Sequence, residues 1–432
     1  MNLSAKDKRY IHHPFTSYSA EKLNIPIVKA HGEFLWDENG KEYIDAISSW
    51  WVNLHGHTHP YINQQIAEQL NELEHVMFSG FTHPPAVQLA EKLLGLLQPY
   101  YTELFYSDNG STAVEVALKM AIQYWNNKGL EKKKFLAFSN SYHGDTFGAM
   151  AVSERDVFTQ PFHSHLFQVE YIDLPTEDNL DRNMERLEQL FKENNIAGFI
   201  FEPLVQAAGG MRMYLAEHLD FMIRLCKDYD VLTIADEVMT GFGRTGTMFA
   251  IDHLQAKPDF ICLSKGLTGG YLPLGVTAYA DSIAQSFKST EHVRTFYHGH
   301  SFTGNPISCT TALASLELFI QEDTFSKINL IRNMQLDFAD MLDCYDMVEN
   351  VRVTGTILAF DVKTGYGEYF YTNPVKDILA QYYLEQGILL RPLGNVVYIL
   401  PPYCIGKESL ERVYEAILKS LEFVSSKLSG HA

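Results

Sequence analysis

Lys265 is the residue whose type and position best fit covalent chemistry. It follows the apolar run DFICLS (259–264) and precedes a glycine-rich segment that begins at Gly266. An amine at the end of a buried strand loses hydration, which lowers its pKa and makes it nucleophilic near neutral pH, as a Schiff-base lysine requires. A lysine in this position can also reach solvent along its own methylene stem. Lys265 therefore needs other residues beside it before it indicates a site.

A carboxylate follows another apolar run. Asp236 closes the run VLTIAD (231–236) and Glu237 comes next, so at least one carboxylate is expected at the edge of the sheet where Lys265 lies. A carboxylate facing the nitrogen of a pyridine cofactor keeps that nitrogen protonated and makes the ring an electron sink. The same group could instead cap a nearby loop or helix.

Small residues stand where a phosphate could bind. Gly110 and Ser111 lie between the run ELFYS and a helix that we expect to start near Ala113. A capping box formed by Thr112 and Glu115 would fix that start. Backbone N–H groups at a helix start bind phosphate esters, although an ordinary helix cap has the same sequence.

Tyr142 follows the run FLAFS (135–139) and supplies an aromatic face. It could stack on a cofactor ring or pack against the edge of the core. Together with the three segments above, it completes a set: an amine, a ring-nitrogen partner, a phosphate cradle and a stacking face. Their joint occurrence after strands favours a cofactor site over four unrelated local roles.

The elements that must position these residues form an α/β pattern. Short apolar runs alternate with amphipathic stretches such as 113–125 and 179–192, which indicates a mostly parallel sheet covered by helices on both faces. On such sheets, ligands bind at the carboxyl ends of the strands. The seven runs are ELFYS (103–107), FLAFS (135–139), FQVEYI (167–172), AGFIFE (197–202), VLTIAD (231–236), DFICLS (259–264) and LGVTAYA (274–280).

The pattern along the chain indicates two domains. Residues 55–322 carry the alternating runs and are expected to form a large cofactor-binding domain. Residues 323–432 read as a long helix, a few strands and a final helix, which indicates a smaller α+β domain. Residues 1–54 include alternating strands around the turn 37–40 and are expected to join that smaller domain.

Composition excludes some classes of partner. The 432 residues hold 34 Lys and Arg against 53 Asp and Glu, a formal net charge of −19, so nucleic-acid binding is not expected. No apolar run approaches the ~18 residues of a membrane span, and the N-terminus lacks a signal-peptide core. Five widely spaced cysteines favour reduced thiols. We therefore expect a cytoplasmic enzyme that makes no contact with membranes.

Two segments carry a resemblance to a known family. IADEVMTGFGRTG (234–246) and PDFICLSKGLTGGYLPLG (258–275) resemble the signature of the class III, fold type I pyridoxal-phosphate aminotransferases, and the resemblance runs over nearly the whole chain. It implies that Lys265 carries pyridoxal 5'-phosphate and moves the substrate proton, and that Asp236 pairs with the ring nitrogen. It further implies that Tyr142 stacks on the ring.

The resemblance also implies a phosphate site that is completed by a second subunit. Gly110 and Ser111 would bind the phosphate from one chain, and Ser301, in place of the family's usual threonine, would reach it from the partner. The implied assembly is a homodimer with active sites at the subunit boundary.

Other segments are similar to members of the family that aminate 8-amino-7-oxononanoate in biotin biosynthesis. They include SSWWVNLHGHTHP (48–60), EPLVQAAGGMRMY (202–214) and RPLGNVVYILPPY (391–403). This similarity implies S-adenosylmethionine as the amino donor, whereas FYHGHSFTGN (296–305) is also similar to members that use lysine. The implied substrate contacts are an aromatic slot, a loop glycine and an arginine for the distal carboxylate. These residues are Tyr18, Trp50, Trp51, Gly299 and Arg391, with Arg244 supporting the site.

Several alternatives remain open at this stage. Transaminases of the ornithine, acetylornithine or 4-aminobutyrate type would share Lys265, Asp236 and the phosphate loop, although the Trp50-Trp51 pair disfavours them. Residues 241–246 match the dinucleotide fingerprint GxGxxG, but no helix is expected directly after them, so an oxidoreductase is disfavoured. The alternating histidines at 55, 57 and 59 lack a carboxylate or thiol cluster, so no metal is expected. A non-catalytic binding protein is the remaining class, and an intact Lys265 disfavours it.

Overall fold

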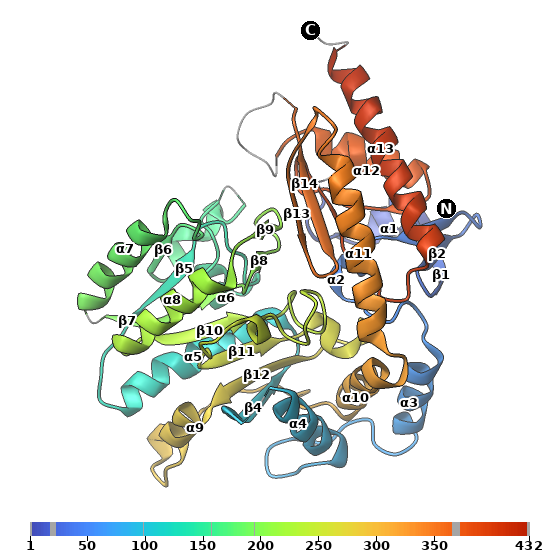
Figure 1. Ribbon diagram of the computed structural model, residues 1–432. Helices are drawn as coiled ribbons and strands as arrows, with labels where there is room; N and C mark the ends of the chain where they lie inside the picture. Colours follow the sequence, from blue (N-terminus) through green and yellow to red (C-terminus); the bar gives the residue numbers. More distant parts are fainter. Residues whose placement is uncertain are drawn as a thin grey trace.

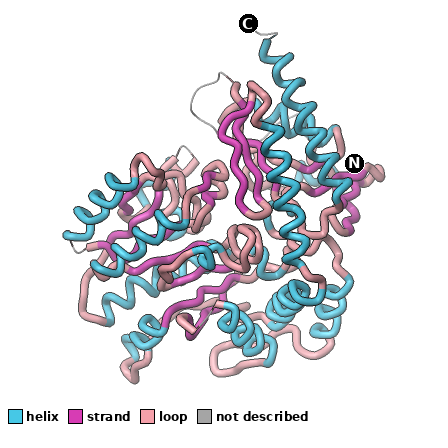
Figure 2. The backbone as a smooth tube through the Cα atoms, in the orientation of Figure 1, coloured by secondary structure: helices cyan, strands magenta, loops and turns pink. Residues whose placement is uncertain are grey.

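The computed structural model describes residues 2–17, 23–97, 99–156, 158–193, 195–364 and 372–429, with the side chains of 426–429 left out. Two regions are visible (Figure 1): one is built around a large central sheet, and the other contains the C-terminal strands and the long helices α11 and α13. Figure 2 shows strands enclosed by helices in the first region and strands lying beside long helices in the second.

The central sheet contains all seven apolar runs. Its strand order is β4-β12-β11-β10-β7-β5-β6, and β12 is antiparallel to both of its neighbours whereas the pairs of β5, β6, β7, β10 and β11 are parallel. This confirms the expected mostly parallel α/β sheet. The strands are β4 (Tyr101–Ser107), β5 (Lys134–Phe138), β6 (Val169–Ile172), β7 (Ile196–Phe201), β10 (Leu232–Asp236), β11 (Phe260–Leu263) and β12 (Gly275–Ala280).

Apolar side chains project from both faces of this sheet. In β11, Phe260 and Cys262 join a core cluster with helix α5, whereas Ile261 and Leu263 join the main core on the other face. Successive residues of a strand point to opposite faces, so a continuous apolar run requires cover on both sides. The helices of this region are α3 (Pro60–Leu70), α4 (Pro84–Leu96), α5 (Gly110–Asn127), α6 (Phe147–Ala151), α7 (Leu180–Lys192), α8 (Ala216–Asp228), α9 (Asp281–Phe287) and α10 (Pro306–Gln321).

The remaining strands form three small sheets. One sheet has the order β13-β14-β16, and β8 pairs with β9 in a short hairpin. The third sheet, β1-β2-β3-β15, joins the N-terminal strands to a strand from the C-terminal part of the chain. The domain boundaries at 54/55 and 322/323 stay predictions. The strands are β1 (Ile27–His31), β2 (Phe34–Asp37), β3 (Glu42–Asp45), β8 (Val205–Gln206), β9 (Arg212–Met213), β13 (Val348–Thr354), β14 (Ile357–Val362), β15 (Ile388–Leu389) and β16 (Val396–Ile399).

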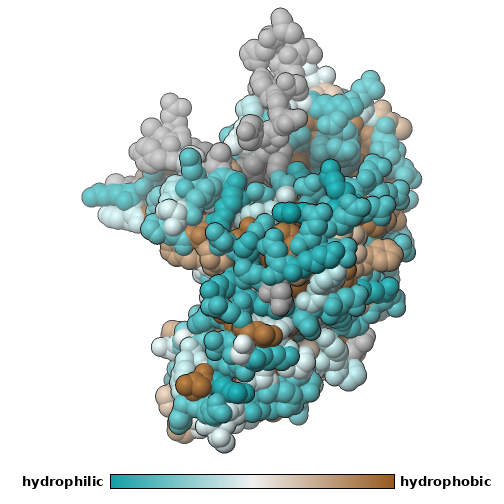
Figure 3. All heavy atoms as spheres, turned by 90° about the vertical axis from the view of Figure 1, so that its left-hand side faces the viewer, coloured by the Kyte–Doolittle hydropathy of each residue, from teal (hydrophilic) through white to brown (hydrophobic). Residues whose placement is uncertain are grey.

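The remaining helices lie near the two ends of the chain. They are α1 (Leu3–Tyr10), α2 (Ser48–Trp51), α11 (Thr324–Leu342), α12 (Val375–Glu385) and α13 (Lys407–Ser429). One face of the molecule is mainly hydrophilic with a few isolated hydrophobic side chains (Figure 3). Among the described residues, no helix combines the length and the apolar character needed to cross a membrane.

The start of helix α5 corrects one prediction. The helix begins at Gly110 rather than near Ala113, and its capping box uses Asn109 and Thr112. The Asn109 side chain accepts from the Thr112 N–H at 3.0 Å, and the Thr112 hydroxyl oxygen accepts from the Asn109 N–H at 3.0 Å. Glu115 is used elsewhere, because its carboxylate accepts from the Gly148 N–H at 2.7 Å in helix α6. Asparagine is as good a helix cap as threonine, so the helix is capped at Asn109, three residues before the predicted cap at Thr112.

Candidate active site

The carboxyl edge of the central sheet borders a cavity of about 440 Å³. This volume lies in the range usual for small-molecule sites. All four predicted segments reach the cavity, which is where ligands bind on sheets of this kind. The predicted residues that line it are Lys265, Asp236, Tyr142, Gly110, Ser111 and Trp51.

Lys265 begins a short 3-10 turn directly after β11, with a φ of +43° that points to a constrained backbone. Its Nζ atom lies 4.4 Å from the centre of the Trp51 ring. Burial lowers the pKa of Lys265 to about 8, and the negative charges of Asp236 and Glu202 oppose that shift. A fraction of the amine is therefore neutral and nucleophilic near neutral pH.

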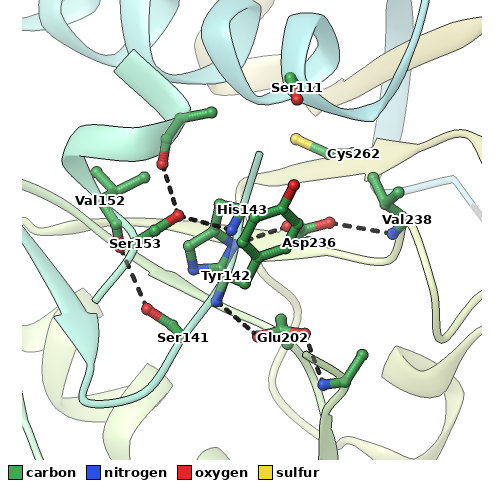
Figure 4. A network of polar contacts seen from close by, with 12 residues as sticks. Ser111, Ser141, Tyr142, His143, Val152, Ser153, Glu202, Asp236, Val238 and Cys262 are labelled. Carbon is green, nitrogen blue, oxygen red and sulfur yellow. Dashed lines mark hydrogen bonds and ion pairs between the residues drawn. The ribbon is translucent and has the colours of Figure 1, made fainter. Parts of the chain in front are cut away.

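Asp236 is held from two sides at the end of β10 (Figure 4). Its Oδ2 atom lies 2.7 Å from Nδ1 of His143, and its Oδ1 atom accepts from the Val238 N–H at 3.1 Å. The backbone N–H of His143 donates to the Ser153 hydroxyl at 2.8 Å. These contacts fix the carboxylate in one orientation at the edge of the cavity.

The start of α5 meets the loop after β5. Ser111 Oγ accepts from the Asp145 N–H at 3.2 Å. Gly144 passes so close that a Cβ on it would lie 2.1 Å from Ser111 Oγ, and its φ is +132°. Only glycine fits there without displacing the helix start. The first N–H groups of a helix have no acceptor within the helix, so this end of α5 is suited to an anion.

Tyr142 is tied to the site through both its backbone and its hydroxyl. Its N–H donates to Glu202 Oε1 at 3.2 Å, and its hydroxyl donates to Asp145 Oδ2 at 2.9 Å. Burial raises the pKa of the Tyr142 phenol well above its usual range, so the hydroxyl stays protonated. Figure 4 shows Tyr142 beside His143 and Asp236.

Two residues of the site were missed in the sequence. They are His143, which follows Tyr142, and Glu202, which follows β7 directly; both line the cavity. Burial raises the pKa of Glu202 to about 7, the charge of His143 opposes this, and that of Asp236 adds to it. The strand-end rule that identified Asp236 would have found Glu202 as well.

The residues expected to bind the substrate are only partly brought together. The Arg391 guanidinium carbon lies 4.3 Å from the centre of the Trp50 ring. Trp51 is buried, and its indole N–H donates to the Tyr398 hydroxyl at 3.1 Å. Tyr18 lies outside the described residues. Trp51 therefore lies beside Lys265 in the cavity, whereas Trp50 lies beside Arg391, and neither Trp50 nor Arg391 is among the described residues that line the cavity.

Gly299 and Ser301 are exposed and are not among the described residues that line the cavity. The chain alone does not bring them to Lys265, and their contact with the site of a second subunit stays a prediction.

Arg244 has a defined role in the structure. It is buried, and its guanidinium donates to the carbonyls of Pro401 at 2.9 Å and Trp51 at 3.3 Å. It also lies 5.0 Å from the centre of the Tyr403 ring. Arg244 thus joins residues 241–246 to the segment that carries the Trp pair.

The histidines at 55, 57 and 59 have separate partners. His57 pairs with Asp45 at 3.0 Å, His59 pairs with Glu322 at 2.8 Å, and His55 is buried in the core. Within the described part of the chain, no group of three metal-ligating side chains occurs. All five cysteines are free thiols, and three of them are buried.

The donor set fits pyridoxal phosphate. One cavity holds an amine of lowered pKa, a fixed carboxylate, an aromatic side chain and a helix N-terminus, which match the carbonyl, ring nitrogen, ring face and phosphate of that cofactor. Glu237, the alternative carboxylate, is buried away from this cavity, where it accepts from the Ile251 N–H at 2.7 Å.

Known proteins resemble this chain over nearly its full length. The family model described as aminotransferase class-III matches residues 16–421. A Synechococcus elongatus protein named adenosylmethionine-8-amino-7-oxononanoate aminotransferase is 45% identical, with 95% of this chain and 97% of that protein covered. A crystal structure of a protein with the same name from Methanocaldococcus jannaschii matches with a TM-score of 0.92 at 35% identity, covering 97% of this chain and 98% of the other. An amine transaminase from an uncultivated Pseudomonas species, in a pyridoxal-phosphate-bound form, matches with a TM-score of 0.88 at 29% identity, covering 97% and 99%.

Proposed function

We propose a reaction for this chain, which belongs to the aminotransferase class-III family. The chain aminates the ketone of 8-amino-7-oxononanoate to give 7,8-diaminononanoate, a step of biotin biosynthesis. The observation that carries the proposal is one cavity lined by Lys265, Asp236 and Trp51. The next residue, Trp50, has its ring centre 4.3 Å from the Arg391 guanidinium carbon. Full-length relatives that are named for this reaction support the choice of substrate.

Pyridoxal phosphate supplies the electron sink that lets an amino-bearing carbon lose its proton. Lys265 would hold the cofactor covalently and then carry that proton, because its amine of lowered pKa can both accept and donate near neutral pH. Asp236, oriented by His143, would hold a proton on the ring nitrogen. Tyr142 would cover the ring, and the N–H groups at Gly110 and Ser111 would bind the phosphate.

The substrate would occupy the side of the cavity that Trp51 lines. A nine-carbon keto acid has an apolar chain and a distal carboxylate, so it needs an apolar slot that ends in a cation. Trp50 and Trp51 would line that slot, and Arg391 would pair with the carboxylate. Gly299 would contact the substrate and Ser301 the phosphate from a second chain, which makes a homodimer part of the proposal.

The amino donor is proposed to be S-adenosylmethionine, since the full-length relatives carry it in their names. Lysine is the second candidate, and a reaction of the ornithine or 4-aminobutyrate type is the third. The free cysteines fit a reducing compartment, so we propose a cytoplasmic location.

The experiment mixes the purified, cofactor-loaded protein with each donor separately and follows the visible absorbance band of the bound cofactor. A shift to the band of the aminated cofactor with S-adenosylmethionine, followed by its reversal on adding 8-amino-7-oxononanoate, is expected. A shift with lysine alone would identify lysine as the amino donor and would leave 8-amino-7-oxononanoate as the proposed acceptor. A shift with ornithine, and no reversal by the keto acid, would contradict the proposal.

A further inference from the structure

The Trp50-Trp51 pair sits on a segment with an unusual backbone. All four residues of α2, Ser48–Trp51, have positive φ, with values of 51°, 45°, 74° and 75°. None is glycine, and at Ser49 and Trp50 both φ and ψ lie in the left-handed region. A run of L-residues in this conformation brings each Cβ close to the following carbonyl, so other contacts must stabilise it.

Asp45 supplies those contacts from the end of β3. Its Oδ1 accepts from the N–H of Ser49 at 2.9 Å and from that of Ile47 at 3.3 Å, and its Oδ2 accepts from the Ser49 hydroxyl at 2.7 Å. The carboxylate has no exposed surface. A buried carboxylate that accepts several hydrogen bonds from one turn fixes the conformation of that turn.

His57 completes the support. Its Nε2 lies 3.0 Å from Asp45 Oδ2, and its Nδ1 lies 3.1 Å from the Asn53 amide nitrogen. Because the Asn53 amide is a donor, the network assigns the proton to Nε2, which donates to Asp45. The backbone of His57 is itself fixed, since its N–H and carbonyl both bond to Gly32.

The same network reaches the two ends of the substrate slot. Asp45 is the register partner of Leu389 in β15, two residues before Arg391, whose guanidinium carbon lies 4.3 Å from the Trp50 ring centre. On the other side, a Cβ on Gly270, which lines the cavity, would lie 2.2 Å from Asn53 Oδ1.

We propose that Asp45 and His57 are positioning residues that hold the left-handed turn Ser48–Trp51 and so set the geometry of the aromatic slot. Neither is among the described residues that line the cavity, so they act through Trp50 and Trp51. The inference rests on the proposed function for its substrate, the long-chain keto acid. It assigns the selectivity for that substrate to a pair of residues behind the slot.

The test measures substrate affinity and the state of the turn separately. In Asp45→Asn, an amide N–H group replaces the oxygen that accepts from His57, so two donors face each other. We expect the KM for 8-amino-7-oxononanoate to rise about tenfold while kcat stays within about threefold, because the slot binds substrate without taking part in proton transfer. The near-ultraviolet circular dichroism of the tryptophans should weaken as Trp50 and Trp51 lose their fixed orientation.

Two rescue variants separate positioning from general stability. His57→Gln can still donate to Asp45 and should keep most of the wild-type affinity, whereas His57→Phe should behave like Asp45→Asn. Adding Ser49→Gly to Asp45→Asn should restore affinity, because glycine adopts positive φ without a Cβ conflict.

The matched control is Glu322→Gln, which breaks a similar histidine–carboxylate pair, at 2.8 Å, that does not contact the turn. It should leave the KM unchanged. An unchanged KM and an unchanged tryptophan signal in both Asp45→Asn and His57→Phe would overturn the inference. An equal loss of substrate affinity in Glu322→Gln, or no rescue by Ser49→Gly, would also overturn it.

If the wild type does not aminate the keto acid, the proposed function fails. The tryptophan signal and a crystal structure of Asp45→Asn still decide whether Asp45 holds the turn.

Discussion

The Nδ1 atom of His143 lies 2.7 Å from Oδ2 of Asp236, and both side chains are buried at the end of the central sheet. The two residues come from different strand ends, β5 and β10, which are separated in the sheet by β7. The contact therefore depends on the strand order, and it fixes the Asp236 carboxylate beside the lysine that would hold the cofactor. In the described structure His143 Nε2 has no hydrogen-bond partner, so the histidine is held through Nδ1 and its backbone.

Asp236→Asn should lower the transamination rate by about 100-fold or more, because an amide does not hold a proton on the ring nitrogen as a carboxylate does. Cofactor binding should weaken much less, since the phosphate and ring contacts remain. The measurement is single-turnover kinetics from the visible absorbance of the cofactor, together with its dissociation constant.

Asp259→Asn is the matched control for this variant. Asp259 is also a buried aspartate beside the same sheet, but it accepts from Thr233 and lies outside the cavity. It should lower the melting temperature and leave the turnover of the folded enzyme unchanged. Equal rate losses in the two variants would mean that Asp236 acts only on stability.

Much of the fold could be predicted because its signals are local. Each of the seven apolar runs forms a strand of the central sheet. Lys265, Asp236, Tyr142 and Gly110 follow the ends of these strands and line one cavity, as the position of ligands on such sheets predicts. Burial on both faces requires continuous apolar runs, so these strands are visible in the sequence. The helix cap at Asn109 was misplaced because two overlapping patterns fit the same stretch.

The supporting contacts could not be predicted, because they join segments far apart in sequence. Arg244 donates to carbonyls of residues 51 and 401, and a backbone carbonyl leaves no trace in the side-chain pattern. The left-handed turn at Ser48–Trp51 is equally hidden, since serine and tryptophan do not favour positive φ. It exists because Asp45 and its neighbours stabilise it after folding.

Gly144→Ala should weaken cofactor binding by about tenfold or more. Its new Cβ would lie 2.1 Å from Ser111 Oγ and 2.9 Å from the Ser111 Cα, so the start of α5 must move away from the phosphate. The dissociation constant of pyridoxal phosphate, measured by titrating the cofactor-free protein, reports this change. Gly40→Ala is the control, because Gly40 also has positive φ (+83°) but a Cβ there meets nothing within 4 Å. A similar loss in both variants would point to backbone strain alone.

Arg391→Ala should raise the KM for 8-amino-7-oxononanoate by about 30-fold, which corresponds to about 2 kcal/mol for a lost carboxylate pair. The KM for the donor should change much less, because its contacts with Lys265 and the cofactor remain. Arg412→Ala, which removes a half-exposed arginine 3.9 Å from Glu42, should change neither value. Equal increases for donor and keto acid in Arg391→Ala would reject the carboxylate role.

The lowered pKa of Lys265 has a consequence for stability that does not require turnover. Burial lowers this pKa from its usual 10.5 to about 8, so between pH 8 and pH 10.5 the unfolded chain binds more protons at this residue than the folded chain. The contribution of this residue to the free energy of unfolding therefore rises with pH across that window. Below pH 8 the charged amine is buried in the folded chain and destabilises it by the full amount.

Lys265→Met removes this destabilisation, so the cofactor-free variant should melt at a higher temperature than the cofactor-free wild type at pH 7. The difference should shrink steadily from pH 8 to pH 10.5. A melting difference at Lys265 that stays constant across the window would mean that the amine titrates at its usual pKa, and would remove the basis for its nucleophilic role near neutral pH.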